Sequence, residues 1–283
     1  MTAVVSPLAP KSNFRVTPAF VIGATLVGLH VVVGLLTLVW TPYDPAAMTG
    51  GRLAAPSLAH WAGTDRLGRD LFTEIMVGAR IALSVGVGAV TIAAAIGVTV
   101  GMLAAFASRA VDDVLAATLD ILIAFPTLLL AMLIVAASDG ASLGTAIFAI
   151  GIAASSIVAR LTRILAKRVL AMDYITAARV SGTSWLGIVR IHVLPNIWPT
   201  LIVNFALQFG LAVIAEASLS YLGLGAPPPN ASWGRLLQEA QATVYTAPLG
   251  AIAPGLALVS LVIGLNLFAD GLRDVADPTR WRR

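Results

Sequence analysis

The residue types that carry most enzyme chemistry are scarce and scattered in this chain of 283 residues. Neither of its two lysines, Lys11 and Lys167, follows a glycine, as the lysine of a phosphate-binding P-loop must. The three histidines, His30, His60 and His192, are far apart, and none belongs to an H-E-x-x-H zinc motif. Cysteine is absent, which excludes disulfides, thiol catalysis and thiolate metal sites. We therefore predict no metal site and no cofactor bound by this chain.

One serine motif remains. Gly140-Ala-Ser-Leu-Gly144 matches the G-x-S-x-G pattern of a serine nucleophile. That pattern has a chemical meaning only on a sharp strand-to-helix turn with a histidine base nearby. Here it lies in a small-residue turn between two apolar segments, so we interpret it as a tight turn. An intramembrane serine hydrolase that uses Ser142 and His30 is a remote alternative.

The strongest signal is a polar, basic stretch, residues 173–195, between two long apolar segments. On a helix, six residues of this stretch fall on one face, which is mostly small with an aromatic side chain at each end: Tyr174, Ala177, Ala178, Ser181, Gly182 and Trp185. Such a face suits docking into a groove of another protein. We interpret it as a helix, displayed outside the bilayer, that receives force from a soluble partner.

Capping signals define the ends of this helix. Asp173 is the predicted N-cap, and Gly182 suits the left-handed position that ends a helix. Ser184 is a predicted cap of a second helix, about 185–193, which Pro195 separates from the next apolar segment.

Composition predicts an all-α integral membrane protein. The chain is 58% hydrophobic and 11% charged, with a mean hydropathy of +0.91. A membrane helix needs roughly 20 mainly apolar residues, and the chain holds six long stretches without Asp, Glu, Lys or Arg. We predict six transmembrane helices, at about 17–40, 77–106, 114–137, 143–160, 196–216 and 250–269. Phe125-Pro126 kinks or breaks the third, and Gly97 and Gly101 predict close helix packing in the second.

Basic residues indicate the orientation. If the N-terminus lies in the cytoplasm, the inside segments hold 13 of the 18 Lys and Arg residues, six of them in the 160–190 loop. This distribution follows the positive-inside rule. We expect both termini and the 160–195 loop to be cytoplasmic.

Two acidic residues stand inside the apolar segments. Asp120 lies about one turn from the cytoplasmic end of the third helix, where an ionisable residue is a candidate for the transport pathway or a gate. An interfacial pair with Arg109 or Arg163 is the alternative. Glu216 lies near the outer end of the fifth helix, where gating and hydrogen bonding to a serine two or four residues later are equally plausible.

The basic stretch resembles the EAA loop of type I ABC importer permeases, E-A-A-x3-G-x9-I-x-L-P. The matching residues are Ala177-Ala178, Gly182 and His192-Val-Leu-Pro195, with Thr176 at the Glu position and His192 at the Ile position. Five further segments are similar to the second permease of dipeptide and oligopeptide importers: Gly63-Thr-Asp-x-x-Gly-Arg-Asp70, Gly78-Ala-Arg80, Glu216-Ala-Ser-Leu-Ser-Tyr-Leu-Gly-Leu-Gly225, Ser232-Trp-Gly234 and Asp270-Gly-Leu-Arg-Asp274.

This resemblance implies a type I ABC importer permease fold and half of a heterodimeric translocation pathway in the bacterial cytoplasmic (inner) membrane. The implied partners are a homologous second permease, two ABC ATPases that bind ATP and Mg²⁺, and an extracytoplasmic substrate-binding protein. Nucleic acid is not among them. The implied cargo is a dipeptide or oligopeptide; nickel chelates, glutathione or another small solute are alternatives, because similar permeases carry them.

The resemblance also assigns residues. A coupling helix is implied for 173–185, with the residues Asp173, Tyr174, Thr176, Ala177, Ala178, Ser181, Gly182, Trp185, Leu194 and Pro195. Contact with the binding protein is one reading of Asp65, Arg69 and Asp70, and capping of the second helix is the other.

The predicted organisation is a cytoplasmic tail 1–15, a first transmembrane helix with its outside loop 16–75, a five-helix core 76–270 that includes the EAA-like loop 161–195, and a cytoplasmic tail 271–283. A channel or secondary transporter is the rival function. It does not explain a basic loop with a docking face.

Overall fold

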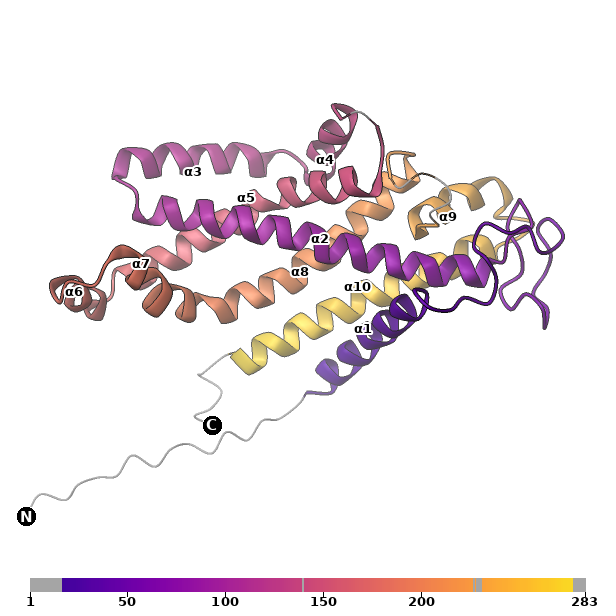
Figure 1. Cartoon of the computed structure of the whole chain (residues 1–283), viewed down its shortest axis with the longest axis horizontal. Helices are drawn as coiled ribbons and strands as arrows, with labels where there is room; N and C mark the ends of the chain where they lie inside the picture. Colours follow the sequence, from indigo (N-terminus) through magenta and orange to yellow (C-terminus); the bar gives the residue numbers. More distant parts are fainter. Residues whose placement is uncertain (1–16, 139, 226, 228–230, 277–283) are drawn as a thin grey trace, which may run out of the picture.

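The computed structural model describes residues 17–138, 140–225, 227 and 231–276, which form helices joined by loops (Figure 1). The helices are α1 Pro18–Leu36, α2 Leu71–Phe106, α3 Arg109–Ala124, α4 Thr127–Ala136, α5 Leu143–Leu170, α6 Asp173–Val180, α7 Trp185–Gly187, α8 Leu194–Tyr221, α9 Trp233–Ala240 and α10 Leu249–Ala276. A π-helical segment, η1 Ile188–Val193, precedes α8, and a 3-10 turn, η2 Gln241–Thr243, follows α9. The described residues contain no β-strand beyond two isolated bridges in the 37–70 loop. The all-α prediction is confirmed, whereas the 1–15 tail and the last seven residues of the 271–283 tail lie outside the described residues.

Five helical segments are long and apolar enough to cross a membrane: α1, α2, α5, the continuous segment 185–221, and α10. The sixth predicted span, 114–137, corresponds to α3 and α4, which pass the same test together and meet at a bend of 89°. Phe125 adopts an extended backbone with ψ 131°, as the residue before a proline prefers. Pro126 has no N–H to continue the helix. The predicted kink is therefore a sharp break.

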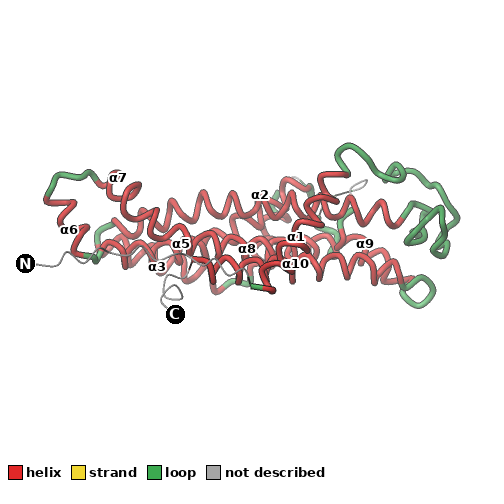
Figure 2. The backbone as a smooth tube through the Cα atoms, turned by 90° about the horizontal axis from the view of Figure 1, so that it is seen from below, coloured by secondary structure: helices red, strands yellow, loops and turns green. Residues whose placement is uncertain are grey.

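The bundle is elongated, and its two ends differ (Figures 1 and 2). The end that carries α6 and α7 is called the α6 end, and the end that carries the 37–70 loop and α9 is called the loop end. α2 has 36 residues, so it is about 54 Å long at 1.5 Å per residue. A hydrocarbon core is about 30 Å thick. α2 therefore extends well beyond such a core and connects the two ends.

α2 and α5 pack with their backbones in close contact. A Cβ atom on Gly101 would lie 2.4 Å from the carbonyl oxygen of Ala159, and one on Gly97 would lie 2.7 Å from that of Ser155. Neither separation leaves room for a methyl group, so glycine is required at both positions. The predicted packing role of this glycine pair is confirmed.

α1 lies against α10 through a similar approach. A Cβ atom on Gly23 would meet the backbone nitrogen of Phe268 at 2.5 Å, and the rings of Phe20 and Phe268 stack at 5.3 Å between centroids. His30 is buried here; its Nδ1 lies 2.8 Å from the carbonyl oxygen of Leu26, and its Nε2 lies 3.3 Å from Ser260 Oγ.

Apolar side chains gather in separate clusters along the bundle. The largest, called the central cluster, joins α2, α4, α5 and α8, with Val85, Ile150 and Leu219 among its buried members. A second, called the α6-end cluster, joins α2, α5, α6, η1 and α8, and its buried residues are Met102, Ala166, Ile175, Ile188, Val189, Val193, Ile197 and Leu201. The α6 end therefore has a core of its own.

The chain runs helically from Trp185 to Tyr221, which corrects the prediction that Pro195 separates two helices. In η1 the hydrogen bonds reach one residue further than in an α-helix, as in the bond from the N–H of Leu194 to the carbonyl oxygen of Val189. Pro195 follows this wider turn near the start of α8. A π-segment gives the proline ring the room that a regular α-helix would not.

An ion network holds the loop end together. Arg69 Nη2 lies 2.6 Å from Asp65 Oδ2, 3.0 Å from Glu74 Oε1 and 3.2 Å from Glu239 Oε2. These carboxylates belong to the loop, α2 and α9, and Arg235 adds a second cation 2.7 Å from Glu239. Burial disfavours the charged guanidinium of Arg69, but Glu74, Asp65 and Glu239 outweigh it and raise the pKa of Arg69 above its ordinary value.

The α2–α5 contact generates the first prediction. In Gly101→Val the added side chain cannot fit against Ala159, so the two helices must separate locally. We expect a loss of about 1–3 kcal/mol in stability, measured as a lower unfolding temperature in detergent. Gly28→Val is the matched control, because a Cβ on Gly28 meets nothing within 4 Å. Equal effects of the two substitutions would contradict the packing role.

The ion network generates the second prediction. In Arg69→Met three carboxylates lose their shared cation, and removing one partner of a buried ion pair costs about 3–5 kcal/mol. We expect the 37–70 loop to become sensitive to protease while the membrane helices stay intact. Arg66→Met, which changes an exposed neighbour, is the control. Equal protease resistance in all three proteins would show that the network does not hold the loop.

Candidate functional site

α6 lies at the α6 end, apart from the main bundle (Figure 1), and buries only Ile175, which joins the α6-end cluster. Its N-cap is Met172, not Asp173 as predicted, and no side chain caps it. Asp173 is instead the first helical residue, where a carboxylate is stabilised by the helix dipole.

The predicted docking face is available along α6. Tyr174, Ala177, Ser181 and Gly182 are exposed, and Ala178 is partly exposed. Gly182 has the predicted left-handed conformation, with φ +81°. The next N–H, of Thr183, returns to the carbonyl oxygen of Ala178 at 3.0 Å and ends the helix.

Trp185 does not share this face, which corrects the single-helix interpretation. The chain turns at Gly182 before it reaches Trp185, and the Trp185 ring packs edge-on to Phe106 of α2 at 6.1 Å between centroids. Ser184 caps α7 as predicted, because its Oγ accepts the N–H of Gly187 at 3.2 Å. The docking face therefore ends at Gly182.

The two positions that depart from the EAA pattern have different surroundings. Thr176 is exposed on α6, whereas the half-buried ring of His192 lies 5.8 Å from that of Tyr174. Asn196 Nδ2 donates to the carbonyl oxygen of His192 at 2.6 Å and reaches Tyr174 Oη at 3.5 Å. These contacts tie α6 to the start of α8, where Leu194 is half-buried and Pro195 exposed.

Asp120 pairs with a residue other than the two predicted. Its carboxylate lies 3.2 Å from Arg160 Nη1 on α5, and both side chains are at least half exposed. Arg163, one of the predicted partners, instead binds Asp112, which sequence analysis did not single out. The pair Asp120–Arg160 thus forms part of the contact between α3 and α5.

Asp112 forms the most extensive ion pair at the α6 end. Arg163 donates to it through Nε at 2.6 Å and Nη2 at 2.9 Å, and Lys167 also contacts it. The signal in the sequence was the spacing of Arg163 and Lys167, which places two cations on one helix face. These three side chains are called the Asp112 clamp.

Glu216 has the hydrogen-bonding role that we weighed against gating. It is 2% exposed, and Ser220, four residues later, donates to it at 2.6 Å. Ser232, the N-cap of α9, also bonds to it. Glu216 therefore joins the end of α8 to the start of α9, so a change in its contacts would move both.

The three candidate contacts for a binding protein are buried. The side chains of Asp65 and Arg69 are each 8% exposed, and that of Asp70 is 2% exposed. Asp70 caps α2 as the alternative predicted, because it accepts the N–H of Thr73 at 2.8 Å; it also lies 2.9 Å from His60. These residues hold the loop end in shape. Sequence analysis missed Glu74 and Glu239, which complete the network; Glu239 is 170 residues away from Arg69 in the sequence.

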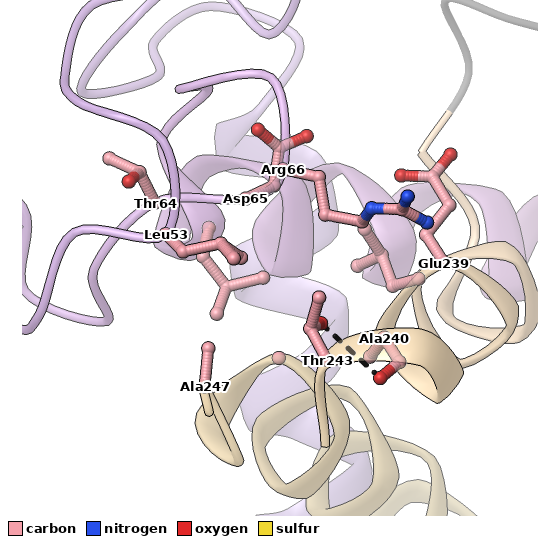
Figure 3. A pocket seen from close by; sticks show the side chains of 11 residues that line it. Leu53, Thr64, Asp65, Arg66, Glu239, Ala240, Thr243 and Ala247 are labelled. Carbon is pink, nitrogen blue, oxygen red and sulfur yellow. Dashed lines mark hydrogen bonds between the residues drawn. The ribbon is translucent and has the colours of Figure 1, made fainter. Parts of the chain in front are cut away.

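A pocket lies between the 37–70 loop and α9–η2 (Figure 3). Its lining includes Thr64 and Asp65 from the loop and Glu239 and Thr243 from α9 and η2. Its volume is ≈ 30 Å³, and one water needs about 10–15 Å³. The pocket can hold water but is too small for a peptide.

The serine hydrolase alternative has no geometry to support it. Ser142 caps α5 in a reciprocal capping box with Thr145, in which each side chain bonds the other's backbone. His30 is engaged with Leu26 and Ser260 instead. The motif around Ser142 forms the capped start of α5, which is a structural role.

Residues 97–282 match the protein-family model described as "Binding-protein-dependent transport system inner membrane component". The dipeptide transport system permease protein DppC of Alkalihalophilus pseudofirmus is 41% identical over 227 residues, which is 80% of this chain and 74% of the relative. The glutathione transport system permease protein GsiD of Pectobacterium atrosepticum is 38% identical over 261 residues, or 90% and 86%. That of Escherichia coli O6:K15:H31 is 41% identical over 223 residues, or 79% and 73%.

The family match covers more than half of the chain and includes α3 to α10. It agrees with the helical bundle, with the membrane-length helices and with the exposed helix α6 between α5 and α8. The chain belongs to the permease subunits of binding-protein-dependent ABC importers, the multi-pass membrane components of these transporters, and is not itself an enzyme.

Proposed function

We propose that this permease forms half of the translocation pathway of an importer for dipeptides or oligopeptides. A homologous permease would form the other half, two ABC ATPases would bind ATP and Mg²⁺, and an extracytoplasmic binding protein would deliver the cargo. The observation that carries the proposal is α6, a helix that buries only Ile175 and leaves the small residues Ala177, Ser181 and Gly182 exposed. Relatives named for dipeptide and glutathione transport support the cargo class.

In this proposal the α6 end faces the cytoplasm and the loop end faces outward. The basic residues of the 160–190 stretch support that orientation through the positive-inside rule. α1 begins and α10 ends toward the α6 end (Figure 1), so both termini would be cytoplasmic and the membrane would be the bacterial cytoplasmic membrane.

α6 acts as the coupling helix by occupying a cleft of one ATPase. ATP binding closes the ATPase pair and brings the coupling helices of the two permeases together. The α6-end cluster then transmits this displacement to α5 and α8, because Ile175 is fully buried in it. Alternating access follows as a rigid-body motion between inward-open and outward-open states.

An acidic residue in the docking face tests the coupling role. In Ala178→Asp a charge would be buried in the ATPase cleft without a partner, so we expect substrate-loaded binding protein to lose its stimulation of ATP hydrolysis. Val180→Asp is the control, because Val180 is 85% exposed on another side of α6. Unchanged stimulation in Ala178→Asp, measured with the purified complex, would refute the assignment.

The cargo is tested by uptake into proteoliposomes that contain the co-purified complex and its binding protein. We expect a labelled dipeptide to accumulate when ATP is supplied on the side of the membrane that the α6 end faces. An unlabelled tripeptide should compete with the dipeptide and reduce its uptake. Glutathione and a nickel chelate serve as the alternative cargoes. If only glutathione or only the nickel chelate is taken up, the importer function stands and the proposed substrate changes. If the chain purifies without an ATPase, the importer function itself is contradicted.

A further inference from the structure

α3 is held to the bundle in an unusual way for a membrane helix. Of its 16 residues only Asp112 and Leu119 are buried. Within the described part of the chain, the four apolar clusters contain no residue of α3. Apolar packing therefore contributes little to its position, and charged contacts must supply the rest.

Those charged contacts all reach α5. Asp112 is 8% exposed and receives both Nε and Nη2 of Arg163, the forked geometry that orients two groups most strictly. Lys167 approaches the same carboxylate from one turn further along α5. Two turns along α3, the pair Asp120–Arg160 repeats the arrangement at the surface. The clamp thus fixes both the distance and the rotation of α3 relative to α5.

The part of α5 that carries the clamp is continuous with the coupling helix. α5 ends at Leu170, three residues after Lys167, and α6 begins at Asp173. Between Arg163 and Lys167, Ala166 is fully buried in the α6-end cluster, which also contains Ile175 of α6. The end of α5 and α6 therefore form one packed unit, to which the clamp attaches α3.

The other half of the α3–α4 pair packs into a different cluster, at another level of the shared helices α2, α5 and α8. Ala131 and Val135 of α4 are buried in the central cluster with α2, α5 and α8. Between the two attachments lies the break at Phe125–Pro126, where α3 and α4 meet at 89°. Phe125 is 54% exposed, so the break itself is not fixed by packing around that ring.

We propose that the Asp112 clamp makes α3 move with the coupling helix, so that displacement of α6 is taken up as a change of angle at the Phe125–Pro126 break. Asp112, Arg163 and Lys167 are then positioning residues for coupling. This inference rests on the proposed function, because it needs an ATPase that displaces α6. α3 and α6 act as one body, and α4 stays with the central cluster.

Spin labels test the motion directly. The chain has no cysteine, so Val114→Cys on α3 can be paired with Ala171→Cys beside α6 or with Leu133→Cys on α4, all at exposed positions. The full complex, with cysteine-free partner subunits, is compared without nucleotide and with ATP trapped. We expect the distance between the labels at Val114→Cys and Ala171→Cys to be the same in both states. The distance between the labels at Val114→Cys and Leu133→Cys should shift by more than about 2 Å, the scale of helix shifts at interfaces. If the distance between the labels at Val114→Cys and Ala171→Cys differs between the two states while the clamp is intact, the proposal is overturned.

Clamp variants test its effect on transport. In Asp112→Asn we expect the α3–Ala171 distance to vary between the two states and the ATP consumed per peptide to rise at least about fivefold, the lower end of coupling between two sites. The exchange Asp112→Arg with Arg163→Asp restores a pair of opposite charges and should recover part of the coupling. Asp113→Asn is the control, because Asp113 is exposed. If Asp112 had only a structural role, Asp112→Asn would lower the amount of folded complex without changing the ATP consumed per peptide.

Two results separate this inference from the proposed function. If the unmodified complex shows no substrate-stimulated ATP hydrolysis, the proposed function fails. If it shows stimulation but Asp112→Asn couples as well as Asp113→Asn, only the clamp proposal fails. Lys167→Met, which leaves the Arg163 fork in place, is the milder variant if Asp112→Asn does not fold. Coupling in Lys167→Met equal to that of the unmodified complex then refutes the clamp proposal.

Discussion

Close backbone contact between α2 and α5 is the constraint on which the rest of the structure depends. α2 reaches from the loop-end ion network to the α6-end cluster. α5 carries the two basic residues of the clamp and leads into α6. Because lipid provides no hydrophobic force between helices, this contact relies on van der Waals packing. Gly97 and Gly101 make that packing possible by removing the side chains between the two backbones.

Polar interactions take over where the helices emerge at the ends of the bundle. At the loop end, Arg69 joins two carboxylates close to it in sequence, Asp65 and Glu74, to the distant Glu239, and Glu216 joins α8 to α9. At the α6 end, Asp112 joins α3 to α5. Buried ion pairs contribute little net stability but cost much when one partner is lost. Their value here is that they fix which segments move together.

This division suits a transporter that works by alternating access. The apolar clusters mark separate regions of packing along shared helices, and the charged contacts attach α3, which is little buried, to the region at the α6 end. Coupling then requires a displacement of α6 that the α6-end cluster passes on as a whole. Interfaces between packed units favour two discrete arrangements over continuous deformation.

The sequence alone determined the class of protein, the approximate spans and the exposed helix after residue 172, because hydropathy, proline and glycine act locally. The left-handed Gly182, the Ser184 cap and the glycine pair are of this kind. Tertiary structure decided the partner of Asp120, the burial of Arg69, the continuity through Pro195 and the 89° break. These depend on residues distant in sequence or on the packing space around them. Which charged residues pair between two helices depends on how the helices are placed side by side in the folded protein, and no local sequence pattern specifies that placement.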